Sequence, residues 1–147
     1  MKGPLDNARL LMEHSEEDLI AAEAILATGL ALRQCCFHAQ QAVEKDLKAL
    51  LAMADVDYPL THNLGALLPL VEVDHPRLTV WAEEIVSLTP FAVEGRYIGL
   101  QKPDRDWAAA AFATARRVHG YVSGVLEAAC GSAEERAQEG ANDDEGK

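Results

Sequence analysis

Aromatic residues are scarce in this chain of 147 residues, where phenylalanine, tryptophan and tyrosine together make up only 5%. Alanine and leucine dominate the apolar residues, which account for 49% of the sequence. Sheets favour aromatic and β-branched residues, whereas alanine and leucine favour helices. The composition therefore argues against a sheet protein and indicates closely packed helices in one globular domain.

Long apolar runs and paired cysteines are also missing. No run approaches the roughly 20 apolar residues that cross a bilayer, and the first residues contain no apolar signal core. The three cysteines, Cys35, Cys36 and Cys130, have neither zinc-site nor disulfide spacing. We therefore expect a cytoplasmic protein with reduced thiols, without a metal and without a cofactor.

Positive charge is in short supply. Lysine and arginine number 13 against 24 aspartates and glutamates, which gives a formal net charge of −11. An acidic surface repels phosphate backbones at long range, and this argues against tight non-specific binding of nucleic acid. A local basic site on an acidic body remains compatible with this charge.

Apolar residues recur at steps of three and four in four stretches, which is the pattern of amphipathic helices. These stretches predict long helices over about residues 5–26, 30–54, 76–97 and 107–129. Pro90 is expected to kink the third, and a short helix over 64–71 precedes it. No strand-like alternation occurs. The expected fold is therefore all-α, an antiparallel up-and-down bundle of four or five helices.

The C-terminal end differs in composition from the rest. Gly131 is expected to end the last helix. Beyond it, residues 131–147 contain six acidic and two basic residues and no core-forming face, a composition typical of disorder. We therefore predict a helical domain over residues 1–130 and a disordered acidic tail over 131–147.

Polar residues interrupt the apolar face of the second predicted helix. On a helical wheel of about 100° per residue, Gln40 falls inside the stripe of Val43 and Leu47, and Arg33 and Glu44 lie at its edge. A buried amide or carboxylate is costly unless its polar atoms find partners. Gln40 and Glu44 are therefore predicted to form a structural polar seam. The alternative is a wide polar face with Arg33 and Glu44 paired at the surface.

The same helix carries a family resemblance. Its run CFHAQQAVEKDLKALL, residues 36–51, resembles the signature helix of the HEPN (higher eukaryote and prokaryote nucleotide-binding) family. Three further segments are similar to the family and follow its order: DLIAAEAIL at 18–26, THNL at 61–64 and EGRY at 94–97. The resemblance covers about residues 5–129. It implies a bundle of four or five helices that usually forms a homodimer.

The resemblance implies more than one function. Many HEPN proteins are endoribonucleases and often toxins, small prokaryotic members frequently act with a minimal nucleotidyltransferase, and others have lost catalysis. We expect a nucleotide- or RNA-binding partner of a nucleotidyltransferase in a two-component, toxin–antitoxin-like system. The alternatives are a metal-independent endoribonuclease and a catalytically silent dimerisation module.

The ribonuclease motif of the family fits the last helix poorly. Family ribonucleases carry an arginine followed four to six residues later by a histidine, and two such sets meet across the dimer. Here His119 and Tyr121 follow Arg116 and Arg117 too closely, and Thr114 stands where the nearest such arginine would be. We interpret this stretch as structural, with Arg116 and His119 as an alternative catalytic set.

A matching spacing occurs instead in the second predicted helix, at Arg33 and His38. About 140° separates these positions around a continuous helix, so only a kink or a second subunit would bring the side chains together. A metal-free ribonuclease needs a base, an acid and a cation, which histidine and arginine supply. The predicted catalytic residues are therefore Arg33, His38 and His62, although His62 equally suits a helix cap.

Four further residues are predicted to bind nucleotide or RNA: Gln41, Lys45, Arg96 and Tyr97. The first two share the polar sector of the second helix with His38. Arg96 offers a fork for phosphate, and Tyr97 a ring on which a base can stack. The same arginine, or Arg33, is expected to pair with a buried Glu44.

Overall fold

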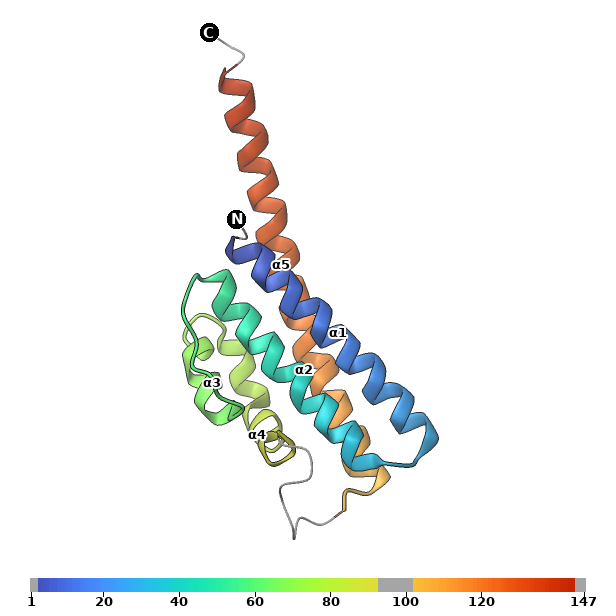
Figure 1. Ribbon diagram of the computed structural model, residues 1–147. Coiled ribbons are helices and arrows are strands. Elements are labelled where there is room, and N and C mark those ends of the chain that lie inside the picture. The colour runs from blue at the N-terminus through green and yellow to red at the C-terminus, as the bar shows by residue number, and fades with distance from the viewer. Residues whose placement is uncertain (1–2, 93–101, 145–147) are drawn as a thin grey trace.

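Three long helices form the body of the protein (Figure 1). The computed structural model describes residues 3–92 and 102–144. α1 (Pro4–Thr28) and α2 (Leu32–Met53) form an antiparallel hairpin, and α5 (Arg105–Asp144) packs against both. α1 ends as predicted at Gly29, whose φ of 68° lies in the left-handed region that glycine adopts without strain.

Shorter elements cover the other side of α2 (Figure 1). In chain order they are α3 (Leu64–Glu72), the 3-10 helix η1 (Pro76–Trp81), α4 (Ala82–Val86) and the 3-10 helix η2 (Thr89–Phe91). The described residues contain no strand, so the prediction of an all-α bundle with five packed α-helices is confirmed. No helix within the described ranges is long and apolar enough to cross a membrane.

The core lies where α2 faces α5. Val43 and Leu47 of α2 and Val118 and Val122 of α5 are all fully buried in one apolar cluster, as the two apolar stripes predict. Alanines between them let the helices approach closely. The adjacent thiols of Cys35 and Cys36 are also buried.

Burial raises the pKa of both thiols in this core. Burial, together with the neighbouring Cys35, raises the pKa of the Cys36 thiol to about 12. The group therefore stays protonated at neutral pH and packs as a small apolar side chain.

The prediction of a single long helix over residues 76–97 is wrong. The chain forms η1, α4 and η2 there instead, and Pro90 lies inside η2. Proline has no N–H to donate to the carbonyl four residues earlier, and its ring clashes with that carbonyl. The helix that begins at Ala82 therefore ends at Val86. Residues 93–97 of the predicted helix lie outside the described residues.

The predicted end of the last helix at Gly131 is also wrong, because α5 continues as one helix to Asp144 (Figure 1). Gly131 does not adopt the left-handed conformation that ends helices. A glycine inside a helix costs only about 1 kcal/mol relative to alanine, which a long helix tolerates. The side chains from Ser132 onward are mainly exposed, and a domain boundary near residue 130 stays a prediction.

Candidate functional site

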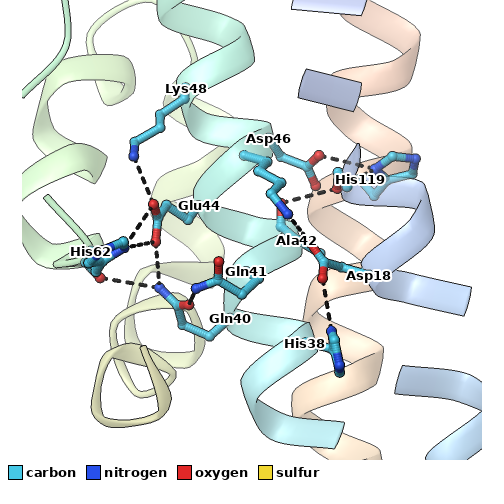
Figure 2. Close-up of polar contacts among 12 residues, drawn as sticks. Asp18, His38, Gln40, Gln41, Ala42, Glu44, Asp46, Lys48, His62 and His119 are labelled. Atoms are coloured by element: carbon cyan, nitrogen blue, oxygen red, sulfur yellow. Dashed lines mark hydrogen bonds and ion pairs between the residues drawn. The ribbon is translucent and has the colours of Figure 1, made fainter. Parts of the chain in front are cut away.

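Glu44 is the centre of a polar cluster between α2 and the start of α3 (Figure 2). Its side chain is only 7% exposed and accepts hydrogen bonds from Lys48 Nζ at 2.7 Å and Gln40 Nε2 at 3.1 Å. His62 Nδ1 lies 3.0 Å from Oε2 of the same carboxylate. We call these four residues the Glu44 cluster: Gln40, Glu44, Lys48 and His62.

Glu44 carries its negative charge inside the protein. Burial alone would raise the pKa of Glu44, but hydrogen bonds from Lys48, Gln40 and His62 outweigh burial and lower the pKa below 4.5. Gln40, which is fully buried, donates also to the backbone carbonyl of His62 at 3.2 Å. The interruption of the apolar stripe is thus a bonded network that joins α2 to the segment before α3.

Among the described residues, the basic side chains bonded to Glu44 are Lys48 and His62. The sequence predicted a buried carboxylate bonded to Arg33 or Arg96. The carboxylate is buried, and Lys48, one turn later on α2, supplies a positive charge. Arg96 and Tyr97 lie outside the described residues, and their predicted roles stay predictions.

A second cluster lies on the opposite flank of α2, where Asp18 of α1 holds two basic groups (Figure 2). His38 Nδ1 is 2.8 Å from one carboxylate oxygen, and Lys45 Nζ donates to the other. The Asp18 side chain is 11% exposed, whereas the side chains of His38 and Lys45 are each more than a quarter exposed. An almost buried carboxylate therefore positions two basic groups at the surface. We call these three residues the Asp18 cluster.

Gln41 extends the Glu44 cluster along α2. Its Nε2 donates to Gln40 Oε1 at 2.6 Å. Gln41 and Lys45, both predicted to bind nucleotide or RNA, thus lie on a partly exposed sector of α2.

The structure does not gather the three predicted catalytic residues at one point. His38 faces α1, whereas His62 contacts α2 from the segment before α3. Arg33 lines a separate hollow of about 320 Å³ at the α1–α2 turn, together with Lys102. A joint catalytic role for Arg33, His38 and His62 within one chain therefore has no geometric support, and it stays a prediction.

A third cluster, which the sequence did not predict, joins α1, α2 and α5 (Figure 2). Asp46 is fully buried, and its Oδ1 lies 3.1 Å from His119 Nδ1. His119 Nε2 is 2.8 Å from Glu16 Oε2, and Ser15 Oγ donates to the Ala42 carbonyl. We call these four residues the Asp46 cluster: Ser15, Glu16, Asp46 and His119. Its contacts with Asp46 of α2 and Glu16 of α1 let the imidazole of His119 act as a clamp between three helices.

We expect the protein to lose stability as the pH rises above about 6.5, the ordinary pKa of histidine. Burial alone would lower the pKa of His119, but the bonds and charges of Asp46 and Glu16 outweigh burial and raise it above 6.5. The folded state therefore binds this proton more tightly than the unfolded chain. The stabilisation is fully present below pH 6.5 and is lost as the pH rises through the raised pKa, by at most about 1.4 kcal/mol per pH unit.

Asp46 also contributes a loss of stability as the pH rises. Burial raises the pKa of Asp46, while His119 and Ser15 counter part of that rise, so its protonated form also favours folding. Urea denaturation at a series of pH values would measure the slope. His119→Gln should flatten the slope above pH 6.5, whereas the matched change of the exposed His14→Gln should leave it unchanged. An equal slope in the His119 variant would contradict the assignment.

The residues that the sequence prediction missed had partial signals. Lys48, which was missed, stands four residues after the predicted Glu44, a spacing at which opposite charges pair on a helix. Asp46 lies at the margin of the apolar stripe of α2, next to Leu47. The partners of Asp18 gave no local signal, because they lie 20 and 27 residues along the chain.

Comparison with known proteins identifies a family for this chain. A search of curated proteins finds no similar sequence. The family model of the HEPN domain matches residues 8–125. That range includes every residue of the Glu44, Asp18 and Asp46 clusters and covers most of the chain. This protein therefore belongs to the HEPN domain family.

Proposed function

We propose that the protein is a nucleotide- or RNA-binding partner of a nucleotidyltransferase-type protein in a toxin–antitoxin-like pair. HEPN domains are associated with nucleotidyltransferase partners and with ribonuclease activity. The observation that carries the binding role is the Asp18 cluster, in which one nearly buried carboxylate holds His38 and Lys45 at the surface. The homodimer that the resemblance implies is part of the proposal.

The Asp18 cluster offers donors to a phosphate group. Lys45 Nζ has three protons and gives one to Asp18, so two remain for phosphate oxygens. His38 uses Nδ1 for Asp18, which leaves Nε2 for a ligand. The carboxylate lowers the net charge of the group but fixes both side chains in place, and fixed donors lose less entropy when they bind.

Lys45→Gln should weaken binding of single-stranded RNA or nucleotide about tenfold, a loss of about 1.4 kcal/mol. Glutamine retains a hydrogen bond to Asp18 but removes the cation that attracts phosphate. Fluorescence anisotropy with a labelled RNA would measure the affinity, and added salt should weaken binding of the parent protein more than of the variant. The control is Lys102→Gln, because Lys102 is exposed and forms no ion pair within the described residues. Equal affinities for all three proteins would refute the role of Lys45.

The carboxylate-held His38 also favours a second candidate function, metal-independent endoribonuclease. A histidine whose Nδ1–H is donated to a carboxylate presents Nε2 as a base, the arrangement used to remove a ribose 2′-hydroxyl proton. Total RNA and tRNA would be incubated with the protein in EDTA. Cleavage that persists in EDTA and disappears in His38→Ala supports this function, and intact RNA opposes it.

A further inference from the structure

A hollow of about 350 Å³ opens on the surface between η1 and α5, and none of its lining residues belongs to the three clusters. Arg77 and Trp81 of η1 line one side, and Arg116, Arg117, Gly120 and Tyr121 of α5 line the other. We call this feature the arginine hollow. Three arginines thus meet at one place on a chain whose formal net charge is −11.

These arginines have no carboxylate partner in the part of the chain that the structure describes. Within residues 3–92 and 102–144, no carboxylate forms an ion pair with Arg77, Arg116 or Arg117. The basic groups of the three clusters, by contrast, are all bound to carboxylates. The arginine hollow is therefore a local positive site on an acidic body, where a phosphate would meet guanidinium groups without having to displace an internal anion.

Aromatic rings form a fixed wall of the hollow. The Tyr121 hydroxyl lies within hydrogen-bonding distance of His75 Nδ1, at 2.7 Å, and burial lowers the pKa of His75. The ring of Tyr121 stands edge-on to Trp81, with 6.5 Å between the ring centres. The Arg77 guanidinium lies 5.8 Å from the centre of the Trp81 ring. A flat, electron-rich ring system beside cations suits a heterocyclic base.

The floor of the hollow has room for a ligand. A Cβ atom built on Gly120 would meet nothing within 4 Å. The volume falls at the lower end of the range for small-molecule sites, which is roughly 300–1,000 Å³. One nucleotide is therefore a better match in size than a duplex.

We infer that the arginine hollow binds the phosphate and base of one nucleotide, with Arg116 and Arg117 on the phosphate and Trp81 beside the base. This inference rests on the proposed function, because it names a separate contact for the same class of ligand. The nucleotide is either free or the end of an RNA strand. Both sources present the same chemistry, a phosphate attached to a nucleoside.

Binding of AMP to the full chain, measured by isothermal titration calorimetry, tests the inference. Gly120→Leu fills the hollow without changing charge and should weaken AMP binding at least about tenfold. Gly124→Leu is the matched control, since Gly124 is also a helical glycine with nothing within 4 Å but does not line the hollow. The double variant Arg116→Gln/Arg117→Gln should lose binding to a similar extent, whereas Arg136→Gln should retain it.

Competition identifies the parts of the ligand. In competition against a labelled AMP, adenosine and inorganic phosphate should each bind at least about tenfold more weakly than unlabelled AMP. Each of them lacks one half of the contact. Phosphate that competes as well as AMP would overturn the role of the ring wall. A short RNA with a 5′ phosphate that competes better than AMP would identify a strand end as the ligand, and weaker competition would identify the free nucleotide.

The two proposals fail in different ways. If the parent protein binds AMP or RNA and the Gly120 and arginine variants bind equally well, the inference is overturned and the proposed function stands. In that case Lys45→Gln would be the variant that loses binding. If the parent protein binds neither AMP nor RNA, the proposed function fails and the inference fails with it.

Discussion

Leu47→Ala should lower the free energy of unfolding by about 2–5 kcal/mol, the largest effect expected from a single change in this protein. Leu47 is fully buried between α2 and α5, in the apolar cluster that also contains Val118 and Val122. The substitution removes apolar contacts and leaves a cavity, because rigid helices around the site close only part of it. Urea denaturation followed by far-UV circular dichroism would measure the loss.

A leucine in the opposite environment provides the control. Leu60 is 99% exposed, so Leu60→Ala makes the same chemical change without a cavity and should alter stability by less than about 0.5 kcal/mol. If Leu47→Ala also cost less than about 0.5 kcal/mol, the packing of α2 against α5 would be refuted.

Glu44→Ala should destabilise the protein by about 3 kcal/mol or more, the typical cost of removing one partner of a buried ion pair. The change leaves the ammonium group of Lys48, whose side chain is 13% exposed, without its anion. It also leaves the fully buried amide of Gln40 without one acceptor. The loss should therefore exceed that of a surface carboxylate, and the exposed Glu83→Ala gives the comparison.

Two further measurements separate charge from packing. Glu44→Gln retains an acceptor for Lys48. Its melting temperature should therefore fall between that of the parent protein and that of Glu44→Ala. The lowered pKa of Glu44 makes its contribution present above pH 4.5 and lost as the pH falls through that pKa. The difference in free energy of unfolding between the parent protein and Glu44→Ala should therefore be smallest in strong acid. A constant difference at every pH would show that packing rather than charge is responsible.

The parts of the fold that follow from local periodicity were predictable, and those that depend on distant contacts were not. α1, α2 and α3 have apolar residues that recur at helical spacing or a clear cap, such as Asn63, which accepts a hydrogen bond from the Gly65 N–H. Between α3 and α5, Pro76 and Pro90 lie in separate short helices. The spacing of apolar residues alone does not reveal where such helices end. At Gly131 the sequence predicts a helix end where the structure has none, because this glycine lies inside a helix that continues to Asp144.

The candidate site shows the same division. Gln40 and Glu44 were predictable because they interrupt an apolar stripe, which requires bonding partners whatever the rest of the fold. The identity of those partners depends on how helices pack. Asp46 meets His119 across 73 residues of sequence, and no local pattern in either helix indicates that pairing. The arginine hollow likewise combines two segments that are separate in sequence.

The long C-terminal helix changes how the protein moves through water. Cys130 lies beside Arg9 near the start of α1, and the rest of α5 runs past that end of the bundle (Figure 1). At 1.5 Å per residue, residues 132–144 form a rod roughly 20 Å long. A compact body with such a rod has a larger Stokes radius and slower end-over-end tumbling than a sphere of 15.9 kDa. A monomer will therefore elute early in gel filtration and resemble a larger species, so its mass must be read from light scattering rather than from elution volume.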